Sequence, residues 1–254
     1  MIKVTDTHAH YDDTAFDGDR ESLLRRLFSE TSEKIITVGC SAERWRPTLE
    51  LTDKFENMYG ALGVHPEDIC GLPEDYPDIL KELASNKKIA AIGEAGLDYH
   101  YENFDRDMQI TVFRRQLNLA NELHMPIIIH SRDATEDTLD ILNEIKPERA
   151  VMHCFSGSAE TARRLVDMGF YISFTGVITF KNARKAISAC EAVPADRLML
   201  ETDCPYMAPV PFRGARCDSS MILSTAAKMA EIKGADTEEM INICNKNAEI
   251  FFEI

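Results

Sequence analysis

The sequence predicts an α/β protein, a single-domain (β/α)8 barrel of the TIM type that spans residues 1–254. Three observations lead to this fold. Short apolar runs recur roughly every 25–35 residues, and helical patterns fill the intervals between them. Polar residues cluster just after several of these runs. The length of 254 residues also suits one such barrel, which typically needs about 250 residues.

The apolar runs have the near-continuous hydrophobicity of strands that are buried on both faces, as in a parallel sheet. They are residues 2–4, 35–38, 59–64, 89–92, 127–129, 150–152, 171–174 and 198–200. An open doubly wound sheet would show the same alternation of strands and helices. We favour the barrel because it brings all strand carboxyl ends to one face, where a site can be built from several strands.

Capping residues predict where the intervening helices begin and end. Two longer amphipathic helices are expected over 105–123 and 236–252, the second starting near Asp236 or Thr237. Asp133, with Glu136 three residues later, has the spacing of a capping box. The remaining boundary signals are Lys146-Pro147 as a stop, Ser158 as an N-cap and Gly169 as a terminator.

The composition is that of an ordinary soluble globular protein, with 44% hydrophobic and 28% charged residues. The net charge of −15 argues against a broad basic surface for long nucleic acid, but not against a nuclease that holds phosphate through metal ions. No run approaches the ~20 residues of a membrane span, and no signal-peptide pattern is present. The seven scattered cysteines favour reduced thiols. We therefore expect a cytoplasmic protein with no membrane partner. We also expect a monomer, although none of these observations bears on the oligomeric state.

The first apolar run leads into the most informative motif, Asp6-Thr7-His8-Ala9-His10. Because side chains alternate along a strand, an H-x-H pair points both imidazoles to the same side. Such a pair needs further ligands to bind a metal. Candidates follow four other runs: Glu94, His130, His153 and Asp203.

Carboxylate and imidazole groups form the ligand set of divalent first-row metals and of Mg²⁺. Four histidines and two carboxylates exceed the need of one ion, so we expect two, as Mg²⁺, Mn²⁺ or Zn²⁺. His8, His10 and Asp203 would hold the first ion, and His130 and His153 the second. Glu94, from a middle strand, would bridge them. Asp203 could also orient the nucleophilic water or act as its base.

Further polar residues surround this predicted centre. His65 follows a neighbouring strand and would face the substrate, where it could donate to a phosphoryl oxygen or help the leaving group. Arg132 and Arg213 could contact phosphate, or could form structural salt bridges. Asp6 and Asp98 could orient ligand histidines, or could serve only as structural acids at turns and strand ends.

Six motifs together resemble the TatD family of metal-dependent deoxyribonucleases over essentially the whole chain. They are Asp-Thr-His-Ala-His, Gly-Val-His-Pro, Gly-Glu-Ala-Gly-Leu-Asp, His-Ser-Arg-Asp-Ala, His-Cys-Phe-Ser-Gly and Glu-Thr-Asp-Cys-Pro-Tyr. The resemblance implies a barrel of the amidohydrolase type, two divalent metals and hydrolysis of phosphodiesters, often as a 3′→5′ exonuclease on single-stranded DNA. By position it implies as metal ligands His8, His10, Glu94, His130, His153 and Asp203, with His65 as an active-site residue.

One segment departs from the family pattern. After Arg213-Gly214 the family usually continues with one or two basic residues and then Asn-Glu-Pro. This chain reads Ala215-Arg216-Cys217-Asp218-Ser219-Ser220 instead. The ligand motifs are unaffected, so the departure bears on substrate preference more than on hydrolysis.

Two other functions compete with a nuclease. An amidohydrolase that cleaves a C–N or ester bond in a small molecule could use the same fold. Many binuclear relatives of that kind bridge their metals with a carboxylated lysine from the fourth strand, whereas this chain has Glu94 there. A non-catalytic metal-dependent binding protein is the third alternative, and the complete ligand set argues against it.

Overall fold

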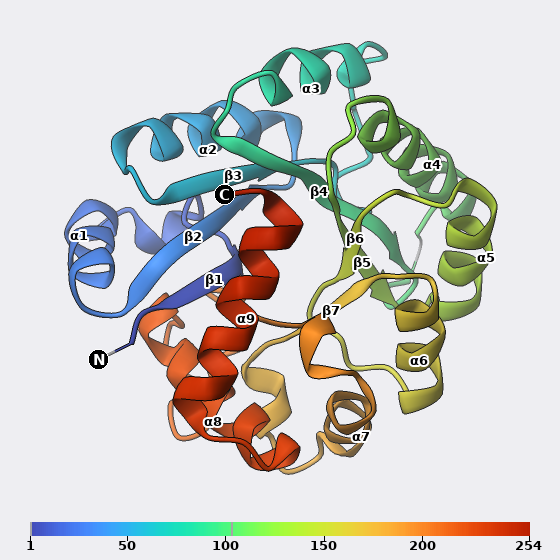
Figure 1. The fold of residues 1–254 in the computed structure, drawn as a ribbon. Helices are drawn as coiled ribbons and strands as arrows, with labels where there is room; N and C mark the ends of the chain where they lie inside the picture. The colour runs from blue at the N-terminus through green and yellow to red at the C-terminus, as the bar shows by residue number, and fades with distance from the viewer. Residues whose placement is uncertain (1, 103) are drawn as a thin grey trace. The chain divides into compact units, whose positions relative to one another are not determined.

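The structure is a computed structural model that describes residues 2–102 and 104–254. Its eight strands form one sheet in the sequence order β1 to β8. Strands and helices alternate along the chain, as the colours of Figure 1 show from blue to red. Strand pairing is parallel between β1 and β2, from β3 through β6, and between β7 and β8. A helix lies between each strand and the next along the chain. This order is that of the predicted (β/α)8 barrel. An open doubly wound sheet is excluded because its strand order reverses at a switch point.

The chain divides into two compact units. The terminal unit consists of residues 1–37 and 153–254, and the central unit of residues 38–152. The interpretation of 1–254 as one domain stays a prediction. Across the part of the chain that the structure describes, no helix combines the length and the apolar character that crossing a membrane requires.

In the terminal unit, β1 (Val4–Ala9) pairs with β2 (Ser32–Gly39), most of which belongs to this unit. β7 (Tyr171–Phe174) pairs with β8 (Leu198–Leu200), and the chain after β8 meets β1 in a parallel bridge between Ala9 and Cys204. The helices are η1 (Thr14–Phe16), α1 (Arg20–Glu30), α6 (Ala159–Asp167), η2 (Gly176–Thr179), α7 (Arg184–Ala192), η3 (Ala195–Arg197), η4 (Ser219–Met221), α8 (Ile222–Lys233) and α9 (Thr237–Phe252).

In the central unit, β4 (Ile89–Asp98) is paired with β3 (Met58–Leu62) and with β5 (Ile127–Arg132). β6 (Ala150–Met152) continues the sheet beside β5. All ten residues of β4 are buried, as expected for a strand covered on both faces. The helices of this unit are α2 (Ala42–Lys54), α3 (Tyr76–Ala84), α4 (Arg106–Glu122) and α5 (Thr135–Ile145).

Most predicted helix boundaries are confirmed. The side chains of Asp105, Ser158 and Asp236 each accept a backbone hydrogen bond at the start of α4, α6 and α9. Lys146, in the left-handed region at φ 51°, ends α5, and Gly169, at φ 88°, follows α6. These are the conformations in which helices commonly end.

The predicted N-cap at Asp133 is wrong. The helix begins at Thr135 after Ala134, and Asp133 has φ 54°. Its carboxylate instead accepts a hydrogen bond from His100 Nδ1 at 2.8 Å. The capping-box spacing was present in the sequence, but a partner from a distant loop takes the side chain.

Candidate metal centre

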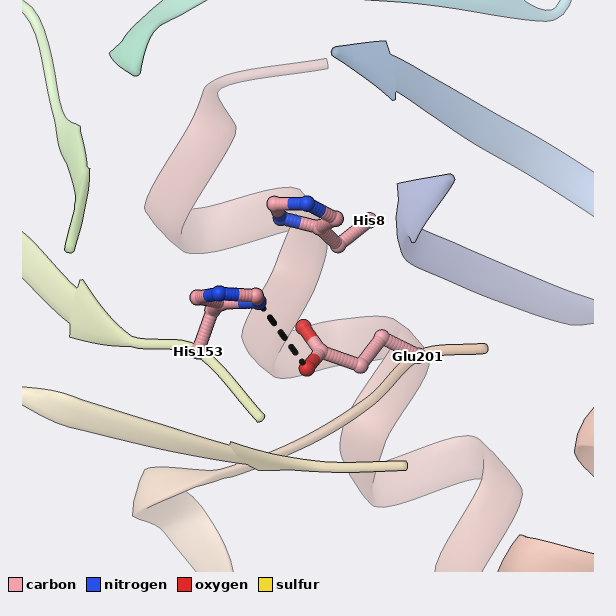
Figure 2. Close-up of side chains that lie close together, drawn as sticks. All are labelled: His8, His153 and Glu201. Atoms are coloured by element: carbon pink, nitrogen blue, oxygen red, sulfur yellow. Dashed lines mark ion pairs between the residues drawn. The ribbon is translucent and has the colours of Figure 1, made fainter. Parts of the chain in front are cut away.

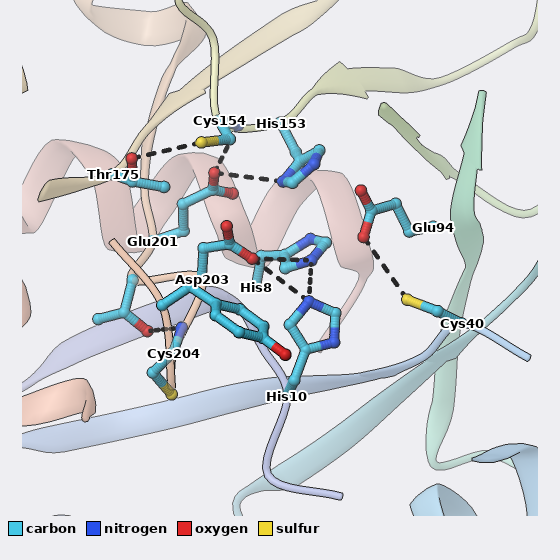
Figure 3. Close-up of polar contacts among 12 residues, drawn as sticks. His8, His10, Cys40, Glu94, His153, Cys154, Thr175, Glu201, Asp203 and Cys204 are labelled. Carbon is cyan, nitrogen blue, oxygen red and sulfur yellow. Dashed lines mark hydrogen bonds and ion pairs between the residues drawn. The ribbon is translucent and has the colours of Figure 1, made fainter. Parts of the chain in front are cut away.

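The terminal unit brings three predicted ligands, His8, His10 and Asp203, together through the pairing of β1 with the chain after β8. The amide of Asp203 donates to the carbonyl of His8 at 2.9 Å, and the amide of His10 donates to Cys204 at 2.7 Å. This pairing places Asp203 Oδ1 3.3 Å from His10 Nε2 and 3.8 Å from His8 Nε2 (Figure 3). The two histidine nitrogens are 3.1 Å apart.

These separations fit a divalent ion. Ligand atoms about 2.0–2.1 Å from a tetrahedral ion lie roughly 3.3 Å from one another. The two imidazole nitrogens and the carboxylate oxygen have this spacing without a backbone rearrangement. The donor set is also that of first-row divalent metals. The residues present therefore fit a metal ion at His8, His10 and Asp203.

His153 and Glu201 lie beside His8 in the same unit. The rings of His8 and His153 are stacked with centroids 4.2 Å apart. Nδ1 of His153 is 3.5 Å from a carboxylate oxygen of Glu201 (Figure 2). Ligand atoms of these three buried side chains all lie within 4.8 Å of one another. They form a second group with metal-ligand chemistry within the terminal unit.

Glu201 was not assigned a role from the sequence. It is 1% exposed, and it accepts hydrogen bonds from the Cys154 amide at 2.6 Å and from Ser173 Oγ at 2.7 Å. The signal was available, because Glu201 directly follows an apolar run and precedes Asp203 by two residues. Its carboxylate fixes the backbone beside His153 and remains within reach of that ring.

The central unit assembles Glu94, His130, His65 and Asp98. Nδ1 of His130 is 2.7 Å from Glu94 Oε1, and Nε2 of the same ring is 3.0 Å from Asp98 Oδ2. His65 Nε2 is 3.6 Å from Glu94 Oε1. Ligand atoms of His65, Asp98 and His130 lie within 4.8 Å of one another. This unit therefore has its own group of imidazole and carboxylate ligands.

Strand pairing explains the contact between Glu94 and His130. Gly96 on β4 is the register partner of His130 on β5. A Cβ at Gly96 would overlap the carbonyl oxygen of His130, so only glycine permits this approach. Contrary to the prediction that Glu94 and His130 follow their strands, both lie within β4 and β5. His8 likewise lies within β1.

Two glutamines of α4 hold the backbone beside these central side chains. The amide group of Gln116 accepts from the Val64 N–H at 2.8 Å and donates to the Val64 carbonyl at 3.0 Å. Gln109 makes the same pair of bonds with Asp98, both at 2.9 Å. Both glutamines are buried. We call these two glutamine–backbone pairs the central clamps. Because Val64 precedes His65, the clamps fix the backbone at His65 and at Asp98, two of the four central side chains.

Asp6 plays the corresponding part in the terminal unit. Its buried carboxylate accepts from Thr202 N–H at 3.0 Å, Thr202 Oγ1 at 2.6 Å and Ser219 Oγ at 2.6 Å. The His8 amide lies 3.4 Å from the same carboxylate. Burial raises the pKa of Asp6 to about 7, although these hydrogen bonds oppose the rise. Asp6 thus forms hydrogen bonds with backbone and hydroxyl groups, whereas Asp98 contacts the ring of His130.

The charges of the two cluster carboxylates follow from their neighbours. Burial works against ionisation of Asp203, but its hydrogen bond to His10 and the nearby imidazoles outweigh burial and lower its pKa. For Asp98 the bonds to His130 and to the His100 amide likewise outweigh burial and lower the pKa. Both carboxylates are therefore ionised at neutral pH, the form that binds a cation.

The two candidate phosphate contacts, Arg132 and Arg213, are engaged locally. Arg132 lies over the Tyr101 ring at 5.2 Å, with Nη1 3.3 Å from the tyrosine hydroxyl. Arg213 lies 3.8 Å from the centre of the Phe180 ring, and Nη1 is 3.4 Å from the Ala208 carbonyl. Among the residues that the structure describes, neither arginine has a salt-bridge partner, which was the alternative role. Their role toward substrate stays a prediction.

Comparison with known proteins decides the family. The family model described as TatD related DNase matches residues 5–253. The chain belongs to the TatD family. Its relative YabD from Bacillus subtilis, named an uncharacterized metal-dependent hydrolase, is 43% identical over 98% of each chain. YcfH from Escherichia coli K12, named in the same way, is 36% identical over 99% of this chain and 96% of its own.

Solved structures of TatD proteins have the same fold. The crystal structure of the TatD homologue YjjV from Escherichia coli superposes with a TM-score of 0.93 at 30% identity. It covers 99% of this chain, and 98% of YjjV is matched. An uncharacterized amidohydrolase from Saccharomyces cerevisiae shares the fold with a TM-score of 0.87 at 19% identity. This TatD chain is thus a (β/α)8 barrel and a metal-dependent hydrolase.

Proposed function

We propose that this TatD protein is a deoxyribonuclease that removes nucleotides from the 3′ end of single-stranded DNA in the cytoplasm. The convergence of imidazole and carboxylate atoms at metal-ligand spacing in the terminal unit carries the proposal. The match to a family described as TatD related DNase supports a phosphodiester as the bond that is cleaved. Two divalent ions per chain, with Glu94 as a bridging ligand, belong to this proposal.

The chemistry can be assigned to side chains of the chain. When bound, divalent ions lower the pKa of a coordinated water and stabilise the charge that develops on phosphoryl oxygens. His8, His10 and Asp203 would hold an ion in the terminal unit, and Glu94 and His130 would contribute ligands from the central unit. The ionised carboxylate of Asp203 can accept a hydrogen bond from the attacking water and orient it.

His65 is suited to donate a proton or a hydrogen bond. The amide of Glu67 donates to His65 Nδ1 at 3.2 Å, so the neutral ring carries its proton on Nε2. That nitrogen points toward the central cluster, 3.6 Å from Glu94. We assign His65 the role of hydrogen-bond donor to a phosphoryl oxygen or to the leaving group.

Digestion of a 5′-labelled single-stranded DNA oligomer tests the proposal. Metal-stripped protein is assayed after adding back Mg²⁺, Mn²⁺ or Zn²⁺, beside Glu94→Gln and the exposed control Glu160→Gln. We expect a ladder that shortens from the 3′ end, requires metal, is absent for Glu94→Gln and is unchanged for Glu160→Gln.

The alternatives predict other results. Protein that binds metal but cleaves no DNA with any ion contradicts the nuclease and favours hydrolysis of a small molecule. The altered segment 215–220 would then be the place to look for the difference in substrate. A metal-dependent binding protein would bind metal but would show no turnover in any assay, with wild type as with Asp203→Asn.

A further inference from the structure

The segment 215–220, which departs from the family pattern, contributes a buried hydroxyl to the terminal unit. Ser219 is fully buried, and its Oγ donates to Asp6 Oδ2 at 2.6 Å. The two residues are 213 positions apart in the chain. This part of the segment therefore lies in the interior of the terminal unit, in contact with Asp6.

The hydrogen bonds around Ser219 have a determined direction. The Ser219 hydroxyl donates to the Asp6 carboxyl group. Tyr11 OH, 2.8 Å from Ser219 Oγ, must then donate to that oxygen. The Ser219 amide in turn donates to Tyr11 OH at 3.0 Å. Tyr11 and Ser219 thus form a closed pair that presents one hydroxyl proton to Asp6.

Thr202 supplies the second hydroxyl proton to the same oxygen. Its Oγ1 donates to Asp6 Oδ2 at 2.6 Å, and it accepts from the Cys204 amide at 3.2 Å. Thr202 stands between the two carboxylates Glu201 and Asp203. Asp6 stands two residues before His8 on β1, whose amide faces the same carboxylate. One carboxylate therefore ties the backbone segment that carries His8 to the segment that carries Asp203.

We propose that Ser219 is a positioning residue for metal binding in the terminal unit. It acts through Asp6 and touches no ligand side chain itself. With its hydroxyl, Asp6 is held against Thr202 and keeps His8 in register with Asp203. Without it, Asp6 loses one of two hydroxyl donors to Oδ2 while it stays buried. This inference rests on the metal binding in the proposed function.

The test compares metal affinity in Ser219→Ala and Ser220→Ala. Ser220 is the adjacent serine in the same 3-10 helix, and its hydroxyl bonds Asp218 instead of Asp6. Metal-stripped proteins are titrated with Zn²⁺ in competition with a chromophoric chelator, and the visible spectrum of bound Co²⁺ reports ligand geometry. Loss of a hydrogen-bond partner behind metal ligands typically weakens binding by 10–100-fold.

We expect Ser219→Ala to weaken binding about tenfold and to shift the Co²⁺ spectrum, with Ser220→Ala within about twofold of wild type. Equal affinities of Ser219→Ala and wild type overturn the inference. So do equal losses in both serine variants, which would indicate a general effect of the loop. If wild type itself binds no metal, the proposed function fails first, which the wild-type titration alone reveals.

A second pair of variants tests the inference even if Ser219→Ala does not fold. Thr202→Val keeps the shape of the side chain and removes its hydroxyl, whereas Thr202→Ser keeps the hydroxyl. The inference predicts about tenfold weaker binding for Thr202→Val and near wild-type binding for Thr202→Ser. Wild-type affinity in Thr202→Val would show that hydroxyl donation to Asp6 has no influence on the ligands.

Discussion

The two units hold the backbone beside their ligands by different chemistry. In the terminal unit a buried carboxylate, Asp6, accepts from the hydroxyls of Thr202 and Ser219. In the central unit the neutral amides of Gln109 and Gln116 each pair with both backbone groups of one residue. Both kinds of side chain fix the backbone beside ligands, but the terminal unit uses a carboxyl group and the central unit uses amides.

The difference has physical consequences. An amide pairs with a peptide group donor to acceptor, so each glutamine satisfies a buried N–H and a buried carbonyl at once. A carboxylate only accepts, so it must collect donors from several parts of the chain. Loss of a glutamine therefore leaves backbone groups unpaired, which lowers stability. Loss of a donor to Asp6 loosens the segments that carry His8 and Asp203, which lowers metal affinity.

The largest effect is expected from the terminal ligands themselves. His153→Ala removes an imidazole that stacks on His8 and faces Glu201. We expect turnover to fall by more than about 100-fold, since even a partner behind a ligand is worth 10–100-fold. Turnover is measured on the oligomer substrate at saturating metal. His124→Ala changes an exposed histidine and serves as control; a comparable loss there would contradict the assignment.

Stability should respond most strongly to the central clamps. Gln116→Ala leaves the N–H and carbonyl of Val64 without their partner, and each unsatisfied buried group costs about 1–3 kcal/mol. We expect the free energy of unfolding in urea to fall by about 2–4 kcal/mol.

Gln109→Ala should behave in the same way through Asp98. Because Gln116 bonds Val64 and Gln109 bonds Asp98, the double variant should lose the sum of both losses within about 0.5 kcal/mol. A loss below about 0.5 kcal/mol in both single variants would show that the clamps are not needed.

Asp6→Asn sharpens the comparison. Asparagine replaces one acceptor oxygen by an NH2 donor, so either the hydroxyls of Thr202 and Ser219 or the Thr202 amide lose their acceptor. We expect metal affinity to fall about tenfold or more.

For each kcal/mol of stability lost, Asp6→Asn should lose more metal affinity than Gln116→Ala. Asp167→Asn, at an exposed position, is the control. If Asp6→Asn changes only the unfolding midpoint and leaves Zn²⁺ affinity as in wild type, the two anchors do not differ in function.

The smallest effect concerns a surface pair of the central unit. The hydrogen bond from Arg106 lowers the pKa of Asp137, and the Tyr99 hydroxyl adds to this. A carboxyl whose folded pKa is lowered adds stability above its unfolded pKa, near 3.8, and loses it as pH falls through the folded value.

Wild type should therefore exceed Asp137→Asn in thermal stability at neutral pH, by less than about 1 kcal/mol for an exposed pair. The difference should shrink below pH 3.8. A difference that is constant over pH would show that the charge of Asp137 contributes nothing. The stability difference between wild type and Asp137→Asn is measured by thermal unfolding at a series of pH values.

Local patterns in the sequence were sufficient for the strand order and for most helix ends. Caps such as Ser158 and Asp236 depend on neighbours within three residues, which the sequence displays. The failed cap at Asp133 shows the limit, because His100 from another loop takes its side chain.

Contacts between distant segments were out of reach for the same reason. The ligand motifs predicted which side chains to expect near β1, but not that Glu201 faces His153. No local pattern connects Ser219 with Asp6, since that contact exists only once the chain after β8 has folded back beside β1. The sequence therefore related the altered segment only to substrate preference, although Cys217 and Ser219 within it are buried.

The number of divalent ions bound per chain tests the central claim most directly. Metal-stripped protein is dialysed against Mn²⁺, and the bound metal is measured by mass spectrometry for wild type, His8→Ala and His130→Ala. The account predicts two ions in wild type. It predicts fewer ions in His8→Ala, which changes the terminal unit, and in His130→Ala, which changes the central unit. No bound ion in wild type, or a number that neither variant changes, would contradict it.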